Sequence, residues 1–186
     1  SARDHVNRTY LPGIELSSRI TATTDLRAAL TGAGIIVVAL PSQIVREVLT
    51  PYRGEVPAEA VVVSLMKGVE LGTDERMSQA TAGLWGLPSA RVAVVSGPNL
   101  AGEIARKQPT TTVVACEDEA VALRVAQACS TPYFRTFTAT DVIGVEIGGA
   151  VKNVIALAVG IAQGLGYGDN TMASIMTRGL SEAARL

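Results

Sequence analysis

The chain has 186 residues, of which 48% are hydrophobic and 18% charged, and its formal net charge is −1 at pH 7. This composition indicates a soluble globular protein with a sizeable core and excludes an intrinsically disordered chain. A net charge near zero gives no electrostatic reason to expect nucleic acid or an anionic membrane as a partner.

Signals for export, metal binding and histidine chemistry are weak in this sequence. The N-terminus lacks the apolar segment of a signal peptide, and the longest apolar run, 154–161, is too short to span a membrane. Cys116 and Cys129 form no CxxC pair, and His5 is the single histidine. We therefore expect no zinc site and no Ser-His-Asp or Cys-His mechanism, and we interpret the cysteines as reduced thiols of a cytoplasmic protein.

Short β-branched segments alternate with helical segments along the first 140 residues. Strands are predicted over 34–40, 60–66, 91–97, 110–116 and 133–139. Helices are predicted between them over 41–49, about 73–84, a short stretch after Pro98-Asn99, and 119–129. Because the strands are continuously apolar and separated by helices, we predict an α/β, Rossmann-like fold with a parallel sheet covered on both faces.

The pattern changes at Asp141. Two helices, predicted over 142–165 and 171–186, follow with no strand between them, and Asp141 is a suitable N-cap for the first. The Gly-rich stretch GLGYGD separates the two helices. We therefore predict one α/β domain over residues 1–140 and the beginning of a helical domain over residues 141–186.

Three polar segments follow predicted strands, at the edge where open parallel sheets bind ligands. They are Pro41-Ser42, Lys67-Gly68 and the turn SGPNLAGE at 96–103. Lys67 is either a ligand-binding cation or an ordinary residue that opens a loop, and its local sequence leaves both open. The turn offers close backbone approach and free N–H groups, but a plain strand–helix turn would look the same.

Lys152 is the one charged residue among the 20 residues 147–166. Gly148 and Gly149 lie about one turn away and leave room for a ligand beside its amine. Burial of an ammonium without a partner is costly, and a solvated helix face would carry more charges. We interpret Lys152 as a buried, ligand-facing residue, and a surface lysine on an amphipathic helix is the alternative.

A dinucleotide fingerprint is not found in the chain. The sequence GAG at 32–34 precedes a predicted strand, whereas the fingerprint follows one, so we interpret it as a helix C-cap and turn. No GxGxxG occurs anywhere in the 186 residues.

Several segments in the same order resemble the bacterial NAD(P)-dependent glycerol-3-phosphate dehydrogenase family. They are NRTYLPGI, VVALPSQIVREVL, SLMKGVE, VVSGPNLAGEIA, DVIGVEIGGAVKNVIALAVGIAQGLGYGDN and TRGLSEAARL. The resemblance implies a Rossmann-like NAD(P)-binding domain over 1–140, incomplete here, and the start of a helical substrate domain. It also implies reversible hydride transfer between NAD(P)H and dihydroxyacetone phosphate, which gives sn-glycerol 3-phosphate for phospholipid synthesis.

The same resemblance implies the roles of the two lysines. Lys152 matches the lysine of the family's VKN sequence and would be the general acid/base that exchanges a proton with the substrate's C2 oxygen. Asn153 would orient that amine or the substrate. Lys67 matches a lysine that contacts both the substrate and the nicotinamide cofactor.

The turn after the third predicted strand supplies the remaining implied contacts. Gly97 and Asn99 match positions that contact the substrate, and Ala101 matches one that touches the cofactor. Other family members carry a small polar residue such as threonine where this chain has Asn99, which we treat as a permissible variant. The sequence does not decide between NAD and NADP.

The resemblance is incomplete at both ends of the chain. Family members begin with a strand, GxGxxG and a helix, and a later Arg-Asn pair grips the substrate phosphate. We therefore expect a fragment that has little or no activity by itself. An open sheet edge would favour self-association, and we expect a homodimer with no nucleic acid or membrane span.

Two other functions remain open from the sequence. A β-hydroxyacid or 6-phosphogluconate dehydrogenase would place asparagine four positions after the lysine, where this chain has Ala156, whereas asparagine follows Lys152 directly as Asn153. A non-catalytic interaction module would use the helices after Asp141 to pair with another chain. Titration with NADH, followed by fluorescence, would separate such a module from an enzyme.

Overall fold

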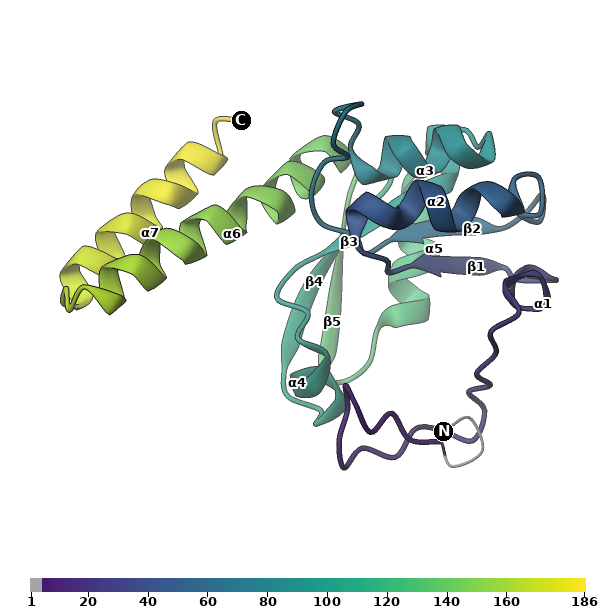
Figure 1. Ribbon diagram of the computed structural model, residues 1–186, viewed down its shortest axis with the longest axis horizontal. Helices are drawn as coiled ribbons and strands as arrows, with labels where there is room; N and C mark the ends of the chain where they lie inside the picture. The colour runs from purple at the N-terminus through teal and green to yellow at the C-terminus, as the bar shows by residue number, and fades with distance from the viewer. Residues whose placement is uncertain (1–4) are drawn as a thin grey trace.

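The computed structural model describes residues 5–186, which form a five-stranded sheet with helices on both faces and a projecting pair of helices (Figure 1). The strands, which follow one another in chain order across the sheet, are β1 (Ile35–Val38), β2 (Val61–Ser64), β3 (Val92–Ser96), β4 (Thr110–Ala115) and β5 (Phe134–Ala139). All five predicted strands are present, and the α/β, Rossmann-like class is confirmed.

The α-helices are α1 (Leu26–Leu30), α2 (Val45–Leu49), α3 (Met77–Trp85), α4 (Ala101–Ala105), α5 (Glu119–Cys129), α6 (Val142–Gly164) and α7 (Asp169–Ala183). Except for α1, for which only the C-cap and turn that follow it were predicted, they lie close to their predicted positions. Three short 3₁₀ helices, η1 (Ser42–Ile44), η2 (Thr50–Tyr52) and η3 (Ser89–Arg91), complete the set. Gly32 follows α1 with φ of 71°, in agreement with the predicted C-cap and turn.

The start of α3 is predicted wrongly. The helix begins at Met77, not near Thr73, because residues 70–75 form a closed turn. The Glu70 N–H donates to the carbonyl of Glu75, and the Asp74 N–H donates to the carbonyl of Glu70. Asp74 has φ of 58°, which a continuing helix does not allow.

The sheet is mixed, whereas the sequence predicted a wholly parallel one. Strands β1, β2 and β3 pair in parallel, and so do β4 and β5, but β3 and β4 are antiparallel. The five-residue helix α4 does not carry the chain back across the sheet, so β4 starts at the edge where β3 ends. The longer helix α5 makes such a crossover between β4 and β5.

Two apolar layers cover the sheet. Helices α2 and α3 pack on one face of β1–β3, with Val62 and Met77 at the centre of that layer. Helix α5 packs on the other face, where Val61, Val63 and Val125 are buried. Successive residues of β2 therefore point into opposite layers, which explains why the whole strand is apolar and buried.

Helix α6 starts on the sheet and then leaves it. Asp141 is its N-cap, as predicted, and accepts a hydrogen bond from Gly144 N at 2.8 Å. Val142 packs against Val94 and Ala115. Beyond these first turns, α6 extends away from the sheet and pairs with α7 (Figure 1).

The length and composition of α6 suffice to cross a membrane, with mean hydropathy of 1.8 over its most apolar part. The sequence prediction considered only the uninterrupted apolar run 154–161. It therefore underestimated the length of the apolar helix, whose polar residues are few and widely spaced. The core helix of a globular protein passes the same test, so this property by itself does not indicate a membrane span.

Candidate functional site

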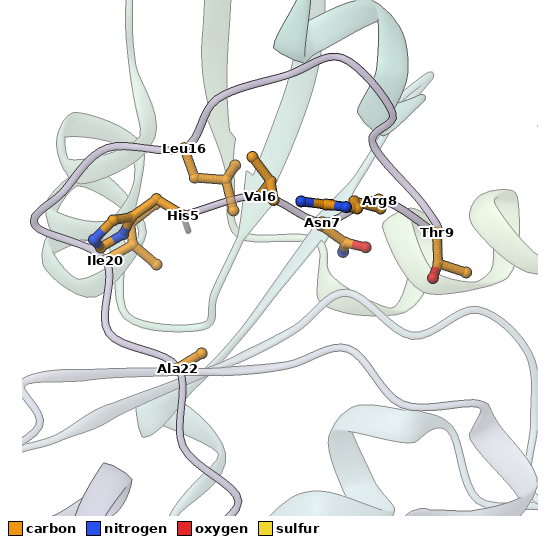
Figure 2. Close-up of a pocket in the computed structure, with 8 residues that line it drawn as sticks. All are labelled: His5, Val6, Asn7, Arg8, Thr9, Leu16, Ile20 and Ala22. Atoms are coloured by element: carbon orange, nitrogen blue, oxygen red, sulfur yellow. The ribbon is translucent and has the colours of Figure 1, made fainter. Parts of the chain in front are cut away.

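The N-terminal segment lines an open cavity of about 410 Å³ that contains none of the predicted site residues. Figure 2 shows its lining, which comes entirely from the extended chain between His5 and Ala22. Lys67 and Lys152 lie elsewhere, so the chemistry predicted from the sequence is not located here.

A second cavity, of about 320 Å³, lies between the end of β3 and the first half of α6. Two glycine-rich segments line it and leave its walls largely free of side chains. The lining residues are Ser96, Gly97, Pro98, Val113, Gly144, Val145, Gly148, Gly149 and Lys152. As predicted, the polar segment after β3 and the lysine of α6 meet at one place.

Lys67 lies beside this cavity, three residues after the end of β2. Its Nζ donates a hydrogen bond to Ser96 Oγ at 3.1 Å. Burial lowers the pKa of Lys67, and the positive charge of Lys152 lowers it further. Within residues 5–186 no carboxylate pairs with Lys67, and Lys152 is near enough for its charge to act on the Lys67 amine.

Lys152 is exposed, which corrects the expectation of a buried amine. The helix has already passed the edge of the sheet at this position, and no other described segment covers it. The residue still lines the cavity wall together with Gly148 and Gly149. The neighbouring Asn153 is exposed as well.

The loop that carries Lys67 is fixed by side chains from the preceding helical segment. Gln43 donates from Nε2 to the carbonyl of Val69 at 2.9 Å and accepts from Leu71 N at 3.0 Å. The Arg46 guanidinium binds both oxygens of Glu70, at 2.9 and 2.7 Å.

These contacts also change the titration of Glu70. The Arg46 hydrogen bonds, and next the hydroxyl of Thr73, lower the pKa of Glu70 from 4.5 to about 2. The carboxylate therefore stays charged well below its ordinary pKa, and its bonds to Arg46 hold the loop after Lys67.

The turn after β3 is held against β4. Thr112 Oγ1 donates to the carbonyl of Ser96 at 3.0 Å and accepts from Asn99 Nδ2 at 3.0 Å. Asn99 thus points toward β4 and is not part of the cavity lining, while its Oδ1 is buried without a partner among the described residues. Ala101, the first residue of α4, is exposed and also lies outside that lining.

Glycine is required at Gly97 by the packing of this turn. A Cβ there would come within 3.0 Å of the Thr111 carbonyl oxygen and of Thr112 Cα. Close approach of β3 and β4 therefore explains this glycine without a ligand.

Gly149 is the point at which α6 touches the site. A Cβ at this position would lie 2.5 Å from Ser96 Oγ and 3.7 Å from Lys67 Nζ. At Gly148 a Cβ would meet nothing within 4 Å. The sequence predicted that both glycines leave room for a ligand beside Lys152. At Gly149 this is wrong, because the Ser96 hydroxyl occupies the space.

A buried carboxylate anchors α6 one turn before Gly149. Glu146 accepts from Ser78 N at 2.9 Å, and from the Ser78 hydroxyl and Arg76 Nη1. Its negative charge sits at the N-terminus of α3, where the helix dipole favours an anion. This contact joins positions about 70 residues apart, and no local sequence pattern indicates it.

Family models give the decisive comparison. The model described as NAD-dependent glycerol-3-phosphate dehydrogenase N-terminus matches residues 2–122, and the corresponding C-terminus model matches residues 141–186. The chain belongs to the NAD-dependent glycerol-3-phosphate dehydrogenase family.

Individual members of the glycerol-3-phosphate dehydrogenase family agree with this assignment. The chain is 57% identical over 182 residues to glycerol-3-phosphate dehydrogenase [NAD(P)+] of Thermobifida fusca, covering 98% of this chain and 54% of that protein. Its identity to the Streptomyces griseus protein of the same name is 56%, with the same coverage. The chain thus spans about half the length of the curated relatives it matches.

Solved structures of glycerol-3-phosphate dehydrogenases have the same fold. The Coxiella burnetii enzyme superposes with a TM-score of 0.89 at 34% identity, over 99% of this chain and 56% of that one. The structure of DsGPDH of Dunaliella salina gives a TM-score of 0.90 at 32% identity, over 99% of this chain and 32% of that one.

Ser96, Glu146 and Gln43 are the residues around this site that sequence reasoning missed. Ser96 stands next to the predicted Gly97, and the sequence alone gives no reason to prefer it. Glu146, in the second turn, is one of the two residues of the apolar helix α6 with an ionisable side chain, a signal as strong as the one that drew attention to Lys152.

Proposed function

We propose that this chain forms the carbonyl-reducing end of an sn-glycerol-3-phosphate dehydrogenase that uses NAD or NADP. The reaction is reversible reduction of dihydroxyacetone phosphate to sn-glycerol 3-phosphate, a precursor of phospholipids. The observation that carries the proposal is a glycine-walled cavity bordered by Lys67 and Lys152, with no carboxylate to neutralise them in residues 5–186. Two unpaired ammonium groups favour an oxygen that gains negative charge.

Lys152 is the general acid/base in this proposal. Its amine has no hydrogen-bond partner in the part of the chain that the structure describes, whereas the Lys67 amine is engaged by Ser96. In reduction Lys152 donates a proton to the C2 oxygen, and in oxidation its neutral amine removes the hydroxyl proton. Lys67 stabilises the charge on the same oxygen.

The residues at this edge fit a nicotinamide and a small phosphorylated ketone. The α6 wall is open at Gly148, where a Cβ would meet nothing within 4 Å, so a flat ring has room to approach there. When bound, NADH or NADPH supplies the hydride. No GxGxxG occurs in these 186 residues, and we assign no pyrophosphate contact to this chain.

The turn after β3 completes the proposed contacts. We assign Gly97 and Asn99 to the substrate, Ala101 to the cofactor, and Asn153 to the orientation of the Lys152 amine. Among residues 5–186 the buried Asn99 oxygen has no partner, and the proposed substrate contact requires this side chain to turn from Thr112 toward the cavity.

Assembly and location are part of the same proposal. We propose a cytoplasmic homodimer that has a small-molecule substrate. The edge strand β1 supports self-association, because Val37 is half-exposed there and the outer backbone groups of the strand have no neighbouring strand in residues 5–186. Sedimentation of the 186-residue chain as a monomer would contradict this part.

Replacement of Lys152 by methionine in the full-length protein tests the reaction. We expect kcat for NADH oxidation with dihydroxyacetone phosphate to fall by about a hundredfold to ten-thousandfold, the usual contribution of general acid–base catalysis. Lys107→Met is the matched control, since Lys107 is exposed and does not line the cavity. An unchanged kcat in Lys152→Met would reject the proposed role.

A further inference from the structure

The single hydrogen bond of the Lys67 amine within the described chain goes to the hydroxyl of Ser96. The two residues come from neighbouring parallel strands: Ser96 ends β3, and Lys67 lies three residues beyond β2. A lysine side chain has four flexible carbons, so its amine occupies one place only where a partner holds it.

Ser96 is itself fixed on two sides. Its carbonyl accepts a hydrogen bond from Thr112 Oγ1 at 3.0 Å, which ties the residue to β4. Its hydroxyl occupies the space that Gly149 leaves free, because a Cβ on Gly149 would lie 2.5 Å from Ser96 Oγ. Any larger residue at position 149 would move either the hydroxyl or helix α6.

We propose that Ser96 is a positioning residue that holds the Lys67 amine at the cavity wall, and that Gly149 is the residue that makes room for it. This inference rests on the proposed function, in which Lys67 acts on the substrate oxygen. Without the Ser96 hydroxyl, the ammonium loses its acceptor while it remains half-buried beside Lys152, so its charged form is less favoured and its place at the cavity wall is no longer fixed. The substrate oxygen that exchanges a proton with Lys152 would then lose the stabilising positive charge of Lys67.

The charges around Lys67 make this contact measurable. Lys152 is the charged group that acts on it, while Glu70, three residues later in the same loop, is turned to Arg46. The Ser96 hydroxyl accepts from the protonated amine and so favours the charged form. Its removal should lower the pKa of Lys67 below its value in the wild type.

The first experiment is Ser96→Ala in the full-length protein. We expect kcat to fall about tenfold, the effect of one hydrogen bond to a charged group, with thermal unfolding little changed. Trace acetylation with acetic anhydride between pH 6 and 11 reports the titration of each amine. Acetylated Lys67 blocks tryptic cleavage and yields the peptide 54–76, and Lys107 serves as the internal standard.

We expect Lys67 to titrate at lower pH in Ser96→Ala, while Lys107 is unmoved. A residue with only a structural role would not change the titration of one particular lysine. Unchanged labelling of Lys67 together with kcat within twofold of the wild type would overturn the inference.

Gly149→Ala provides an independent variant, and Gly83→Ala is its matched control. Both glycines lie inside helices, but a Cβ at the exposed Gly83 would meet nothing within 4 Å. We expect Gly149→Ala to reproduce the lower kcat and the altered labelling of Lys67, and Gly83→Ala to change neither. Identical behaviour of the two variants would contradict the role given to Gly149.

The two proposals fail in different ways. A wild-type protein without dihydroxyacetone phosphate-dependent NADH oxidation would reject the proposed function, whereas the labelling of Lys67 would still report the contact with Ser96. If the wild-type protein is fully active and Ser96→Ala leaves the labelling of Lys67 unchanged, the positioning role alone is rejected.

Discussion

The sheet and the α6–α7 hairpin differ in where their apolar side chains lie. All four residues of β2 are buried between two layers of helices. No residue of α7 is buried in this chain, and large apolar side chains such as Leu157 and Leu180 are about two-thirds exposed. The sheet is therefore stabilised by its own core, whereas the hairpin depends on the few contacts at the start of α6.

The hairpin's attachment combines one small apolar contact with one buried polar contact. Val142 packs on the sheet, and Glu146 binds the N-terminus of α3. The position of Lys152 thus follows from the first two turns of α6 and not from the length of the hairpin. Substitutions in the core, at the attachment and on the hairpin should differ accordingly.

The largest effect on stability is expected in the core, at Met77. This side chain is fully buried between α3 and the sheet, so Met77→Ala should lower the free energy of unfolding by about 2–5 kcal/mol. Met176→Ala makes the same change on α7, at a side chain that is 44% exposed, and should cost less than about 0.5 kcal/mol. Urea unfolding of both 186-residue variants measures the difference, and equal losses would contradict the comparison.

A smaller effect is expected at the attachment, from Glu146→Ala. It leaves Arg76 and the Ser78 N–H without their acceptor, and we expect a loss of about 2–3 kcal/mol because Arg76 can still reach some water. Glu182→Ala removes the exposed pair with Arg178 on α7 and should cost about 0.5 kcal/mol or less. A loss at Glu146 no greater than at Glu182 would show that this contact does not hold α6.

The third effect, reduced by solvent screening because Arg46 is partly exposed, is a pH dependence that arises in the loop after Lys67. The pKa of Glu70 is about 2 in the folded chain against 4.5 in an unfolded one, so the unfolded chain takes up the proton first as the pH falls. The stability supplied by Glu70 is complete above about pH 4.5 and is lost between 4.5 and 2. Glu70→Gln should flatten this part of the stability profile, and added salt should weaken the dependence, since Arg46 is partly exposed.

Local sequence signals predicted the elements well and the contacts between them poorly. The bounds of α5 and the N-cap of α6 at Asp141 follow from residues a few positions apart, and both are confirmed. The antiparallel pairing of β4 depends on how far α4 carries the chain, and this distance cannot be predicted from the residues of α4 alone. Periodicity and spacing predict neighbours along the chain only.

The same limit applies to the candidate site. The sequence identified Lys67 and Lys152 and the sheet edge at which they meet, but it assigned burial to the wrong lysine. Lys67 is half-buried because β3 lies beside it, and Lys152 is exposed because α6 has left the sheet by then. The partners Ser96 and Glu146 depend on which strands and helices adjoin, information that is absent from either local segment.

The anchor at Glu146 makes α6 a lever with its pivot near the site. Lys152 is six residues beyond the pivot, about 9 Å along the axis, and the end of the helix at Gly164 is about 27 Å away. A tilt of about 5° would therefore displace the far end by about 2 Å and Lys152 by less than about 1 Å. A swing of the outer part of the hairpin on this pivot would therefore hardly change the distance of the Lys152 amine from Lys67.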